Sequence, residues 1–189
     1  MPTTPQKRAL FEQAVAARNG LRGDARHAAT EAAIARTLAA MDGWEGVVGL
    51  YAAIRSELNP AGLAAALHAE GRELALPATP VWGQPLVFRR WHPGAPLVRG
   101  RMNVPEPSPE AEVVTIDVAV APPVAFDRRC FRIGYGAGFY DRTLAHLRRT
   151  RPVRAIGIAF ACQEVDRVPD EPHDIPLDAI ATETELIGR

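Results

Sequence analysis

The sequence lacks the features that mark several common classes of protein. Its two cysteines, Cys130 and Cys162, form no Cys-x-x-Cys pair and have no His-x-Cys neighbour. The spacing of a zinc site is therefore missing, and we expect two reduced thiols. No apolar run approaches the roughly 18–20 residues that span a bilayer, and residues 1–10 lack the apolar core of a signal peptide. We therefore expect a cytoplasmic protein without a membrane partner.

An excess of charge of either sign is also missing. Lys and Arg together number 22, as do Asp and Glu, so the formal net charge is zero. This balance predicts no nucleic-acid partner. The chain has 189 residues, of which 47% are hydrophobic and 23% charged, and these values are typical of a globular protein with its own core. Its length predicts one domain over residues 1–189.

Alternating strand and helix patterns predict an α/β fold. The apolar run 47–51, a helix that begins at Asn59-Pro60 and a strand over 73–76, which Pro77 should end, form a parallel β-α-β unit. We therefore predict a largely parallel sheet with helices on both faces and ligands at the carboxyl ends of its strands. Further helices are expected over residues 5–18, 24–41 and 143–149, and further strands over residues 86–88, 116–121, 153–160 and 179–181.

The first two helices are rich in alanine and arginine. Asp24 is expected to cap the second of them. Among Arg18, Arg22, Arg26 and Arg36, most are interpreted as charges that solvate a helix face.

Residues 79–112 differ from the rest of the chain. They contain many of its prolines and two of its three tryptophans, Trp82 and Trp91. We interpret them as an extended binding loop that the prolines stiffen, with a short strand at 86–88. A disordered linker is disfavoured, because aromatic residues are depleted in disordered segments.

The most informative stretch is the glycine loop, residues 132–142, which has the sequence Arg-Ile-Gly-Tyr-Gly-Ala-Gly-Phe-Tyr-Asp-Arg. An apolar strand, a glycine loop and a helix in this order build phosphate sites, because backbone N–H groups and the helix N-terminus attract anions. The loop lacks the Gly-Lys-Ser/Thr of a P-loop and the glycine spacing of a dinucleotide fingerprint. A tight turn without a ligand is the alternative. The rings of Tyr135, Phe139 and Tyr140 argue against it, because such rings can stack on a planar ligand.

Three acids are candidates for ligand binding. Asp141 follows the loop, and a carboxylate beside phosphate oxygens commonly shares a Mg²⁺ ion with them, although a first-turn acid also stabilises a helix. Asp174 is a second candidate ligand, although alone it is interpreted as a turn residue. Glu57 follows a strand end where polar ligand groups are recognised, although alone it is interpreted as a solvated loop acid. We find no Ser/His/Asp or Cys/His arrangement.

Taken together, these segments resemble the 5-formyltetrahydrofolate cyclo-ligase family, also called methenyltetrahydrofolate synthetases. The family's loop has the pattern Arg-Leu-Gly-x-Gly-x-Gly-Tyr-Tyr-Asp, which residues 132–141 match closely. The resemblance spans nearly the whole chain. The other matching positions are Tyr51, Glu57, Leu76-Pro77, Glu106-Pro107, Asp117 to Val120, Pro122, Phe126-Asp127, Ile156 to Phe160, Gln163, Pro169, Glu171, His173-Asp174, Asp178 and Thr182-Glu183.

The resemblance implies a single-domain α/β fold of the Rossmann-like, NagB/RpiA-like kind and a specific reaction. The family closes 5-formyltetrahydrofolate, a reduced folate, to 5,10-methenyltetrahydrofolate with ATP and Mg²⁺, and releases ADP and phosphate. ATP phosphorylates the formyl oxygen, the other folate nitrogen attacks, and phosphate leaves. Catalysis of this kind depends mainly on positioning and charge stabilisation. A cytoplasmic monomer is the family expectation.

The resemblance also assigns roles to residues. Arg132 and Tyr140 would be catalytic, and Asp141 and Asp174 would bind Mg²⁺. A folate would contact Glu57 through its pterin ring. The loop from Trp82 to Met102 would cover the folate. The ATP site would comprise Lys7, Arg8, Arg132, Ile133, Gly134, Tyr135, Gly136, Ala137, Gly138, Phe139 and Tyr140. The folate site would comprise Glu57, Met102, Tyr135, Gly136, Ala137, Gly138 and Phe139.

Four departures from the family pattern support an alternative function. The family's first helix carries Lys and, four residues later, Arg, whereas this chain has Lys7 and Phe11. Ala78 stands where Arg or Lys is common, Ala137 where Gly or Lys is common, and the glycine before the loop is replaced around Cys130. Each lost charge-assisted bond to phosphate would cost about 1.5–3 kcal/mol of binding. The alternative is therefore a family-like protein that binds nucleotide or folate without turnover. Arg8, Arg99 or Arg101 would have to replace the missing phosphate contacts for the chain to be an active enzyme.

Overall fold

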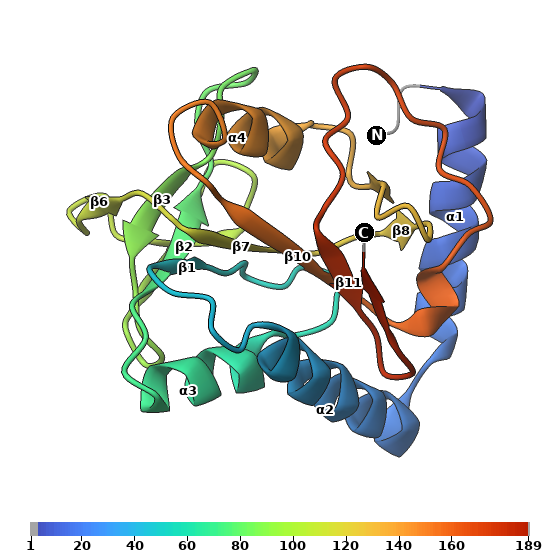
Figure 1. The fold of residues 1–189 in the computed structure, drawn as a ribbon, viewed down its shortest axis with the longest axis horizontal. Helices are drawn as coiled ribbons and strands as arrows, with labels where there is room; N and C mark the ends of the chain where they lie inside the picture. Colours follow the sequence, from blue (N-terminus) through green and yellow to red (C-terminus); the bar gives the residue numbers. More distant parts are fainter. Residues whose placement is uncertain (1–3, 189) are drawn as a thin grey trace.

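The structure, a computed structural model, describes residues 4–188 and is built around one eight-stranded sheet (Figure 1). The strand order is β12-β11-β10-β7-β1-β2-β3-β6. The five strands from β11 to β2 run parallel to one another, and β12, β3 and β6 are antiparallel additions at the two edges. The largely parallel sheet is therefore confirmed. The strands are β1 Val48–Gly49, β2 Leu74–Ala78, β3 Val87–Arg90, β6 Val113–Val114, β7 Val118–Ala121, β10 Arg154–Ile158, β11 Ala179–Ala181 and β12 Leu186–Gly188.

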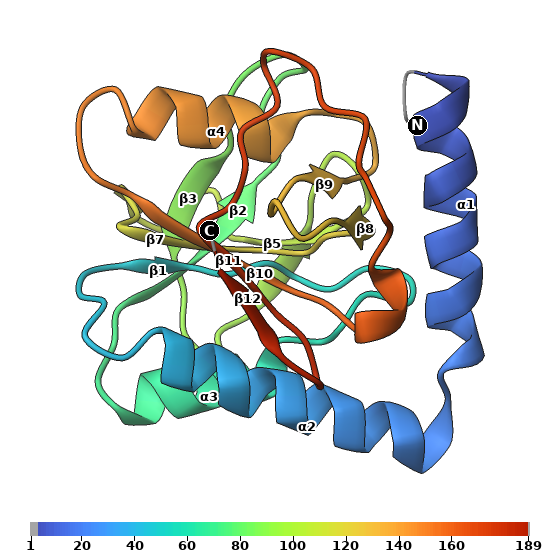
Figure 2. The ribbon, with the colours of Figure 1, turned by 45° about the vertical axis from the view of Figure 1, so that its right-hand side comes forward.

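The helices cover both faces of the sheet, as predicted. They are α1 Pro5–Gly20, α2 Gly23–Ala40, α3 Ala61–Ala69 and α4 Phe139–Leu147. Figure 2 shows α4 on one face, α2 and α3 on the other, and α1 standing at one end of the molecule. Each face has its own apolar cluster, with Leu63 and Leu67 of α3 in one and Leu144 of α4 in the other. Within residues 4–188, no helix combines the length and hydrophobicity that crossing a membrane requires.

The predicted β-α-β unit is present as β1, α3 and β2, with two differences. The helix begins at Ala61, one residue late, although the Asn59 side chain still accepts a bond of 3.0 Å from the Ala61 N–H. Pro77 does not end β2, because the ladder to β1 stops at Ala75 and Pro77 lies beyond it. Asp24 is also not a cap: it lies in the first turn of α2, after the cap residue Arg22.

Residues 79–112 are more structured than predicted. They contain β3 and the antiparallel hairpin of β4 (Leu97–Arg99) and β5 (Pro105–Pro107). The hairpin forms a separate two-stranded sheet, which can accommodate Pro105 and Pro107 at alternate positions. The carboxylate of Glu106, which is buried, accepts a bond of 3.0 Å from the Thr79 N–H and so holds the hairpin against the start of the segment.

A second hairpin, absent from the sequence prediction, precedes the glycine loop. Strands β8 (Ala125–Phe126) and β9 (Arg132–Ile133) lie between the central strand β7 and the loop. The fully buried carboxylate of Asp127 fixes the turn, since it accepts N–H bonds from Arg129, Phe131 and Val168. Cys130 in this turn has φ +62°, a left-handed conformation that glycine adopts most easily. A glycine, which the family resemblance leads us to expect near this point, would adopt this conformation more easily.

The prediction of one domain over residues 1–189 includes residues 1–3 and 189, which lie outside the described range, and it stays a prediction.

The close packing of β10 gives a testable consequence. A Cβ at Gly157 would lie 2.9 Å from Leu177 Cδ1 and 3.0 Å from Pro123 Cγ. We expect Gly157→Ala to lower the free energy of unfolding by about 1–3 kcal/mol, measured by urea denaturation, because the core is overpacked. The control is Gly188→Ala on β12, where nothing lies within 4 Å of the added carbon. Equal stabilities of the two variants would contradict the prediction.

Candidate functional site

The glycine loop leads from β9 directly into α4. Gly136 and Gly138 have φ +83° and +62°, so both need the left-handed freedom of glycine. Gly138 is the N-cap of α4 and makes no side-chain capping bond, and the first helical bond runs from the Arg142 N–H to the Gly138 carbonyl at 3.1 Å. The backbone N–H groups at the start of α4 therefore lack a side-chain cap, which is the arrangement that binds anions. The helix begins at Phe139, four residues before the predicted Thr143.

Arg132 ties the loop to the C-terminal segment. Its guanidinium donates to the Ile175 carbonyl at 2.6 Å and to an Asp141 carboxylate oxygen at 2.8 Å. The same carboxylate oxygen accepts from the Ile175 N–H at 3.1 Å. The Arg132 side chain is only 7% exposed, and Asp141 is 21% exposed. The two residues predicted as a catalytic cation and a metal ligand therefore form one partly buried ion pair at the helix N-terminus.

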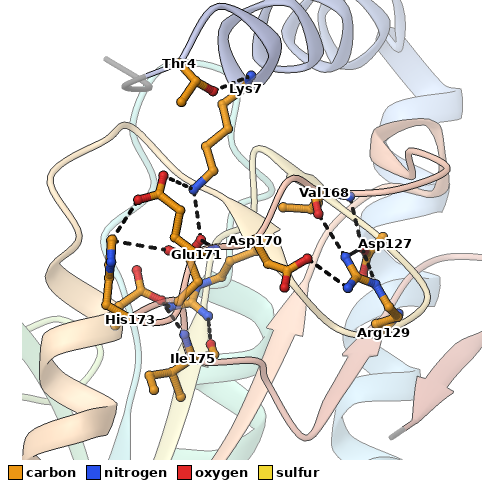
Figure 3. A network of polar contacts seen from close by, with 12 residues as sticks. Thr4, Lys7, Asp127, Arg129, Val168, Asp170, Glu171, His173 and Ile175 are labelled. Atoms are coloured by element: carbon orange, nitrogen blue, oxygen red, sulfur yellow. Dashed lines mark hydrogen bonds and ion pairs between the residues drawn. The ribbon is translucent and has the colours of Figure 1, made fainter.

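Lys7 and Asp174 form a second such pair. Figure 3 shows Lys7 reaching from α1 toward Glu171 in the C-terminal loop. Its ammonium lies 2.8 Å from an Asp174 carboxylate oxygen and 3.2 Å from Glu171. Burial lowers the pKa of Lys7, but hydrogen bonds and attraction from Asp174 and then Glu171 raise it above 10.5 overall. The structure thus brings a predicted phosphate ligand and a predicted metal ligand together across 167 positions of sequence.

The two aspartates fit the chemistry of a Mg²⁺ site. Asp141 lies in the first turn of α4, and Asp174 precedes Ile175, whose N–H donates to Asp141. Mg²⁺ binds through one or two carboxylates together with substrate phosphates. Among residues 4–188, no group of three or more His, Cys, Asp and Glu side chains is arranged to hold a metal ion alone. The magnesium assignment therefore stays a prediction that requires phosphate oxygens as further ligands.

Glu57 is not the solvated loop acid that its position alone suggests. It is 6% exposed, and its Oε2 accepts a bond of 2.8 Å from the Ile54 N–H. Burial raises the pKa of Glu57 from 4.5 to about 7, against smaller opposing contributions from the Ile54 bond and the charges of Arg18 and Arg55. A buried carboxylate with one backbone partner has lone pairs available for a ligand.

Tyr140 connects Glu57 to the glycine loop. Its hydroxyl donates to the Val120 carbonyl at 3.4 Å, at the end of central strand β7. Burial raises the pKa of Tyr140, the Glu57 carboxylate adds to that rise, and the Arg132 guanidinium opposes it. Tyr140 therefore lies within electrostatic reach of both Glu57 and Arg132.

Phe11 occupies the helix position at which the family resemblance leads us to expect arginine. It is 6% exposed and packs with Ala14, Val124 and Ile133. Its ring meets the edge of Tyr135 with centroids 5.6 Å apart and planes at 74°. The substitution therefore replaces a cation with a core side chain that supports the glycine loop.

Arg18 is a site residue that the sequence interpretation missed. It is 1% exposed, and it donates to the Ser56 hydroxyl at 3.1 Å and to the Tyr135 hydroxyl at 3.2 Å. Its spacing contained a signal: Lys7, Phe11 and Arg18 recur at positions i, i+4 and i+11 and so lie on one face of α1. Arg26 and Arg36 also do more than solvate a helix, since they donate to the backbone carbonyls of Ser56 and Thr182 at 2.6 Å each.

The remaining predicted residues are distributed unevenly. Arg8 is exposed on α1, and Met102 is 52% exposed in the turn of the β4–β5 hairpin. The Ile133 side chain is buried in the core, and the Ala137 carbonyl accepts a bond from Arg142, so these two offer a ligand mainly their remaining backbone groups. Gly134 is exposed, and a Cβ added there would meet nothing within 4 Å. Trp82 is 69% exposed, but its ring centroid lies 6.1 Å from that of Phe139. The proline-rich segment therefore reaches the glycine loop.

The buried state of Glu57 predicts a distinctive pH dependence of stability. Between pH 4.5 and about 7 the folded chain binds more protons at Glu57 than the unfolded chain, so the free energy of unfolding falls as pH rises through this window. Glu57→Gln removes this ionisation, so its free energy of unfolding should not show this fall. The free energy of unfolding of the variant minus that of wild type should therefore increase by on the order of 3 kcal/mol from pH 5 to pH 8. Urea denaturation of both proteins at the two pH values measures the difference. The same pH dependence in both would contradict the assignment.

Comparison with known proteins agrees with this geometry. A sequence model of the 5-formyltetrahydrofolate cyclo-ligase family matches residues 3–183. The 5-formyltetrahydrofolate cyclo-ligase of Escherichia coli K12 is 36% identical over 146 residues, which cover 74% of this chain and 79% of that protein. The protein of the same name from Haemophilus influenzae is 31% identical over 135 residues, which cover 69% of this chain and 72% of that protein.

Solved structures with a similar fold include two 5,10-methenyltetrahydrofolate synthetases. The NMR structure of 5,10-methenyltetrahydrofolate synthetase from Aquifex aeolicus aligns with a TM-score of 0.79 at 30% identity, covering 96% of this chain and 92% of that chain. A 5,10-methenyltetrahydrofolate synthetase from Mycoplasma pneumoniae aligns with a TM-score of 0.75 at 23% identity, covering 94% and 98%, and supports the fold alone. Since the family pattern extends over most of the sequence and two relatives exceed 30% identity, the chain belongs to the 5-formyltetrahydrofolate cyclo-ligase family of enzymes.

Proposed function

We propose that the protein closes 5-formyltetrahydrofolate to 5,10-methenyltetrahydrofolate at the expense of ATP, with Mg²⁺ as cofactor and ADP and phosphate as products. The observation that supports this most directly is that Tyr140 of the glycine loop lies within electrostatic reach of both buried Glu57 and Arg132. A carboxylate that can recognise ring N–H groups and a loop that can hold phosphates thus share one site. Family membership supports the same reaction.

The phosphate end of the proposed site contains charges of both signs. Lys7 and Arg132 would move toward the ATP phosphates, together with the N–H groups of the loop and of the first turn of α4. Asp141 and Asp174 would then hold Mg²⁺, which would neutralise phosphate charge. Before nucleotide binds, each cation is paired with one of these acids, so neither charge is left unpaired in a partly buried site.

At the folate end, Glu57 would accept hydrogen bonds from the amino and ring N–H groups of the pterin. Tyr140 and Tyr135 would bound the ring, and the backbone between them would place the formyl oxygen near the terminal phosphate of ATP. The formyl oxygen would take the terminal phosphoryl group as its bond to ADP breaks. The second folate nitrogen would then attack the formyl carbon and lose its proton to solvent, and the carbon–oxygen bond would break as phosphate leaves. The protein's contribution is positioning and exclusion of water, to which Trp82 beside Phe139 would add cover.

The proposal includes the finer predictions that follow from the family. These are a cytoplasmic monomer without a nucleic-acid or membrane partner, and contacts from Arg8 to ATP and from Met102 to folate. Arg8 and Met102 are both exposed, so both would need ligand binding to draw them in.

One observation favours a second function, in which the protein binds nucleotide or folate without turnover. Phe11 replaces a family arginine and is buried in the core beside Tyr135. The side chain at this position therefore cannot bind a phosphate. The loss of one charge-assisted bond, about 1.5–3 kcal/mol, would weaken nucleotide binding.

A direct assay distinguishes the two functions. Purified protein is mixed with 5-formyltetrahydrofolate and Mg-ATP, and the absorbance of the methenyl product is followed. We expect a rise in absorbance that depends on ATP and on enzyme concentration. No ATP-dependent rise at ample enzyme, with folate binding confirmed separately, would sink the cyclo-ligase proposal and leave the binding function.

The metal assignment is tested at Asp141. We expect Asp141→Asn to lower the rate by about 100-fold or more, because it removes a carboxylate that would hold the metal against the phosphates. The matched control is Glu185→Gln, which also breaks an arginine ion pair, with Arg128 at 2.8 Å, but on an exposed part of the surface. A full rate in Asp141→Asn would remove the metal assignment, provided that the control is also fully active.

A further inference from the structure

We propose that Arg129 is a positioning residue for the proposed metal ligand Asp174. Its guanidinium anchors the start of the C-terminal loop, residues 168–175, and thereby sets where the Asp174 carboxylate lies. Arg129 belongs to the turn between β8 and β9, three residues before Arg132. The inference rests on the proposed function, because it takes Asp174 as a ligand of Mg²⁺.

The Arg129 guanidinium joins the β8–β9 turn to the C-terminal loop (Figure 3). Its Nε and Nη2 donate to Oδ2 of Asp127, in the same turn, at 3.1 and 2.7 Å. Nη2 also donates to the Val168 carbonyl at 2.8 Å, and Nη1 donates to the Asp170 carboxylate at 2.8 Å. Because a guanidinium carries its donors in a rigid planar fork, these bonds fix the loop relative to the turn.

Val168, the first residue of the loop, is held through both of its backbone polar groups. Its N–H donates to Asp127 Oδ2 at 2.9 Å, while its carbonyl accepts the bond from Arg129. Its side chain is 1% exposed and belongs to the apolar cluster that contains Phe11 and Ile133. The loop therefore begins at a fixed point.

A short series of bonds leads from Asp170 to Asp174. Asp170, which Arg129 holds, directly precedes Glu171. The Glu171 N–H donates to Asp174 Oδ2 at 2.9 Å, and the Asp174 N–H donates to the Glu171 carbonyl at 2.9 Å. The same Oδ2 accepts the bond from Lys7. The orientation of the Asp174 carboxylate thus depends on the peptide group that adjoins Asp170.

The far end of the loop is held by the same hairpin. Ile175 bonds Arg132 through its carbonyl and Asp141 through its N–H, so two arginines three positions apart hold the two ends. Residues 169–174 between these points form neither helix nor strand. When Lys7 turns to phosphate, as proposed above, Asp174 would keep the Glu171 N–H as its partner. Outer partners of this kind typically change metal affinity by about 10- to 100-fold.

This role can be separated from a purely structural one. In Arg129→Gln, Asp127 would keep three backbone partners, the N–H groups of residue 129, Phe131 and Val168. The turn should therefore survive, and the lost bonds are those to the Val168 carbonyl and to Asp170. The Arg129 side chain is 34% exposed, so a shorter polar side chain can be solvated there.

The test measures equilibrium binding of adenylyl imidodiphosphate, an ATP analogue, with Mg²⁺ and with a chelator. The Mg²⁺ ratio is the factor by which Mg²⁺ tightens this binding. We expect Arg129→Gln to lower the ratio about tenfold, with affinity for the metal-free analogue and for 5-formyltetrahydrofolate nearly unchanged. Arg129→Lys, which keeps the charge but not the fork, should give an intermediate ratio.

The matched control is Arg128→Gln. Arg128 is the neighbouring residue and also contacts two acids, Glu164 and Glu185, but neither lies in the C-terminal loop. This variant should keep the wild-type ratio. A second measurement needs no ligand: amide hydrogen exchange of residues 169–175 should quicken in Arg129→Gln and not in Arg128→Gln. If Arg129→Gln is unstable, Asp170→Asn at an exposed position should lower the ratio in the same direction by less.

Three results would overturn the inference. They are an unchanged Mg²⁺ ratio in Arg129→Gln, an equal loss of folate and metal-free analogue binding, which would indicate a structural role alone, or a wild-type ratio of one. The proposed function fails separately. A wild type that shows the Mg²⁺ effect without ATP-dependent absorbance would overturn the cyclo-ligase proposal alone. An active wild type whose Mg²⁺ ratio survives Arg129→Gln would overturn this inference alone.

Discussion

The site depends on one ion pair, between the Arg132 guanidinium and the Asp141 carboxylate, with Ile175 completing it from the C-terminal loop. This contact fixes where β9 ends, where α4 begins, and how close the C-terminal loop lies to both. Without it, a 7% exposed guanidinium would be left without an opposite charge, which costs several kcal/mol in a protein interior. The loop conformation is therefore determined by long-range partners as much as by its glycines.

The helix α1 extends this arrangement of charges from one end of the site to the other. Its inward face presents a cation, an aromatic ring and a second cation, in the order Lys7, Phe11, Arg18. Lys7 is neutralised by acids of the C-terminal loop, whereas Arg18 has only hydroxyl partners among the described residues. The two ends of the helix therefore differ, with an ion-paired ammonium at Lys7 and a guanidinium bonded to hydroxyl groups at Arg18. A single amphipathic helix, packed at the end of the sheet, sets both the polarity and the length of the site.

Sequence reasoning predicted the parts of this fold that depend on local pattern. The apolar runs at 47–51 and 116–121 identify central strands, because strands buried on both faces need continuous hydrophobic residues. The hairpin β8–β9 escaped prediction because each strand has two residues and the turn is held by the side chain of Asp127. The burial of Glu57 also escaped prediction, because no local pattern reports which distant residues will cover a carboxylate in a loop. The loop residues were predicted by motif, but the pairing of Asp141 with Ile175 and of Lys7 with Asp174 required the structure.

Lys7 is the sole lysine among the 189 residues, so the chain has a single side-chain amine, and it lies in the ion-paired part of the site. Its raised pKa keeps that amine protonated, and a protonated amine does not attack acylating reagents. Amine-directed labelling, crosslinking or immobilisation of the folded chain therefore has Lys7 and the N-terminal amine as its targets. The extent of Lys7 modification therefore measures how often its contacts with Asp174 and Glu171 open. Any reagent that couples to Lys7 also removes the positive charge that makes these contacts.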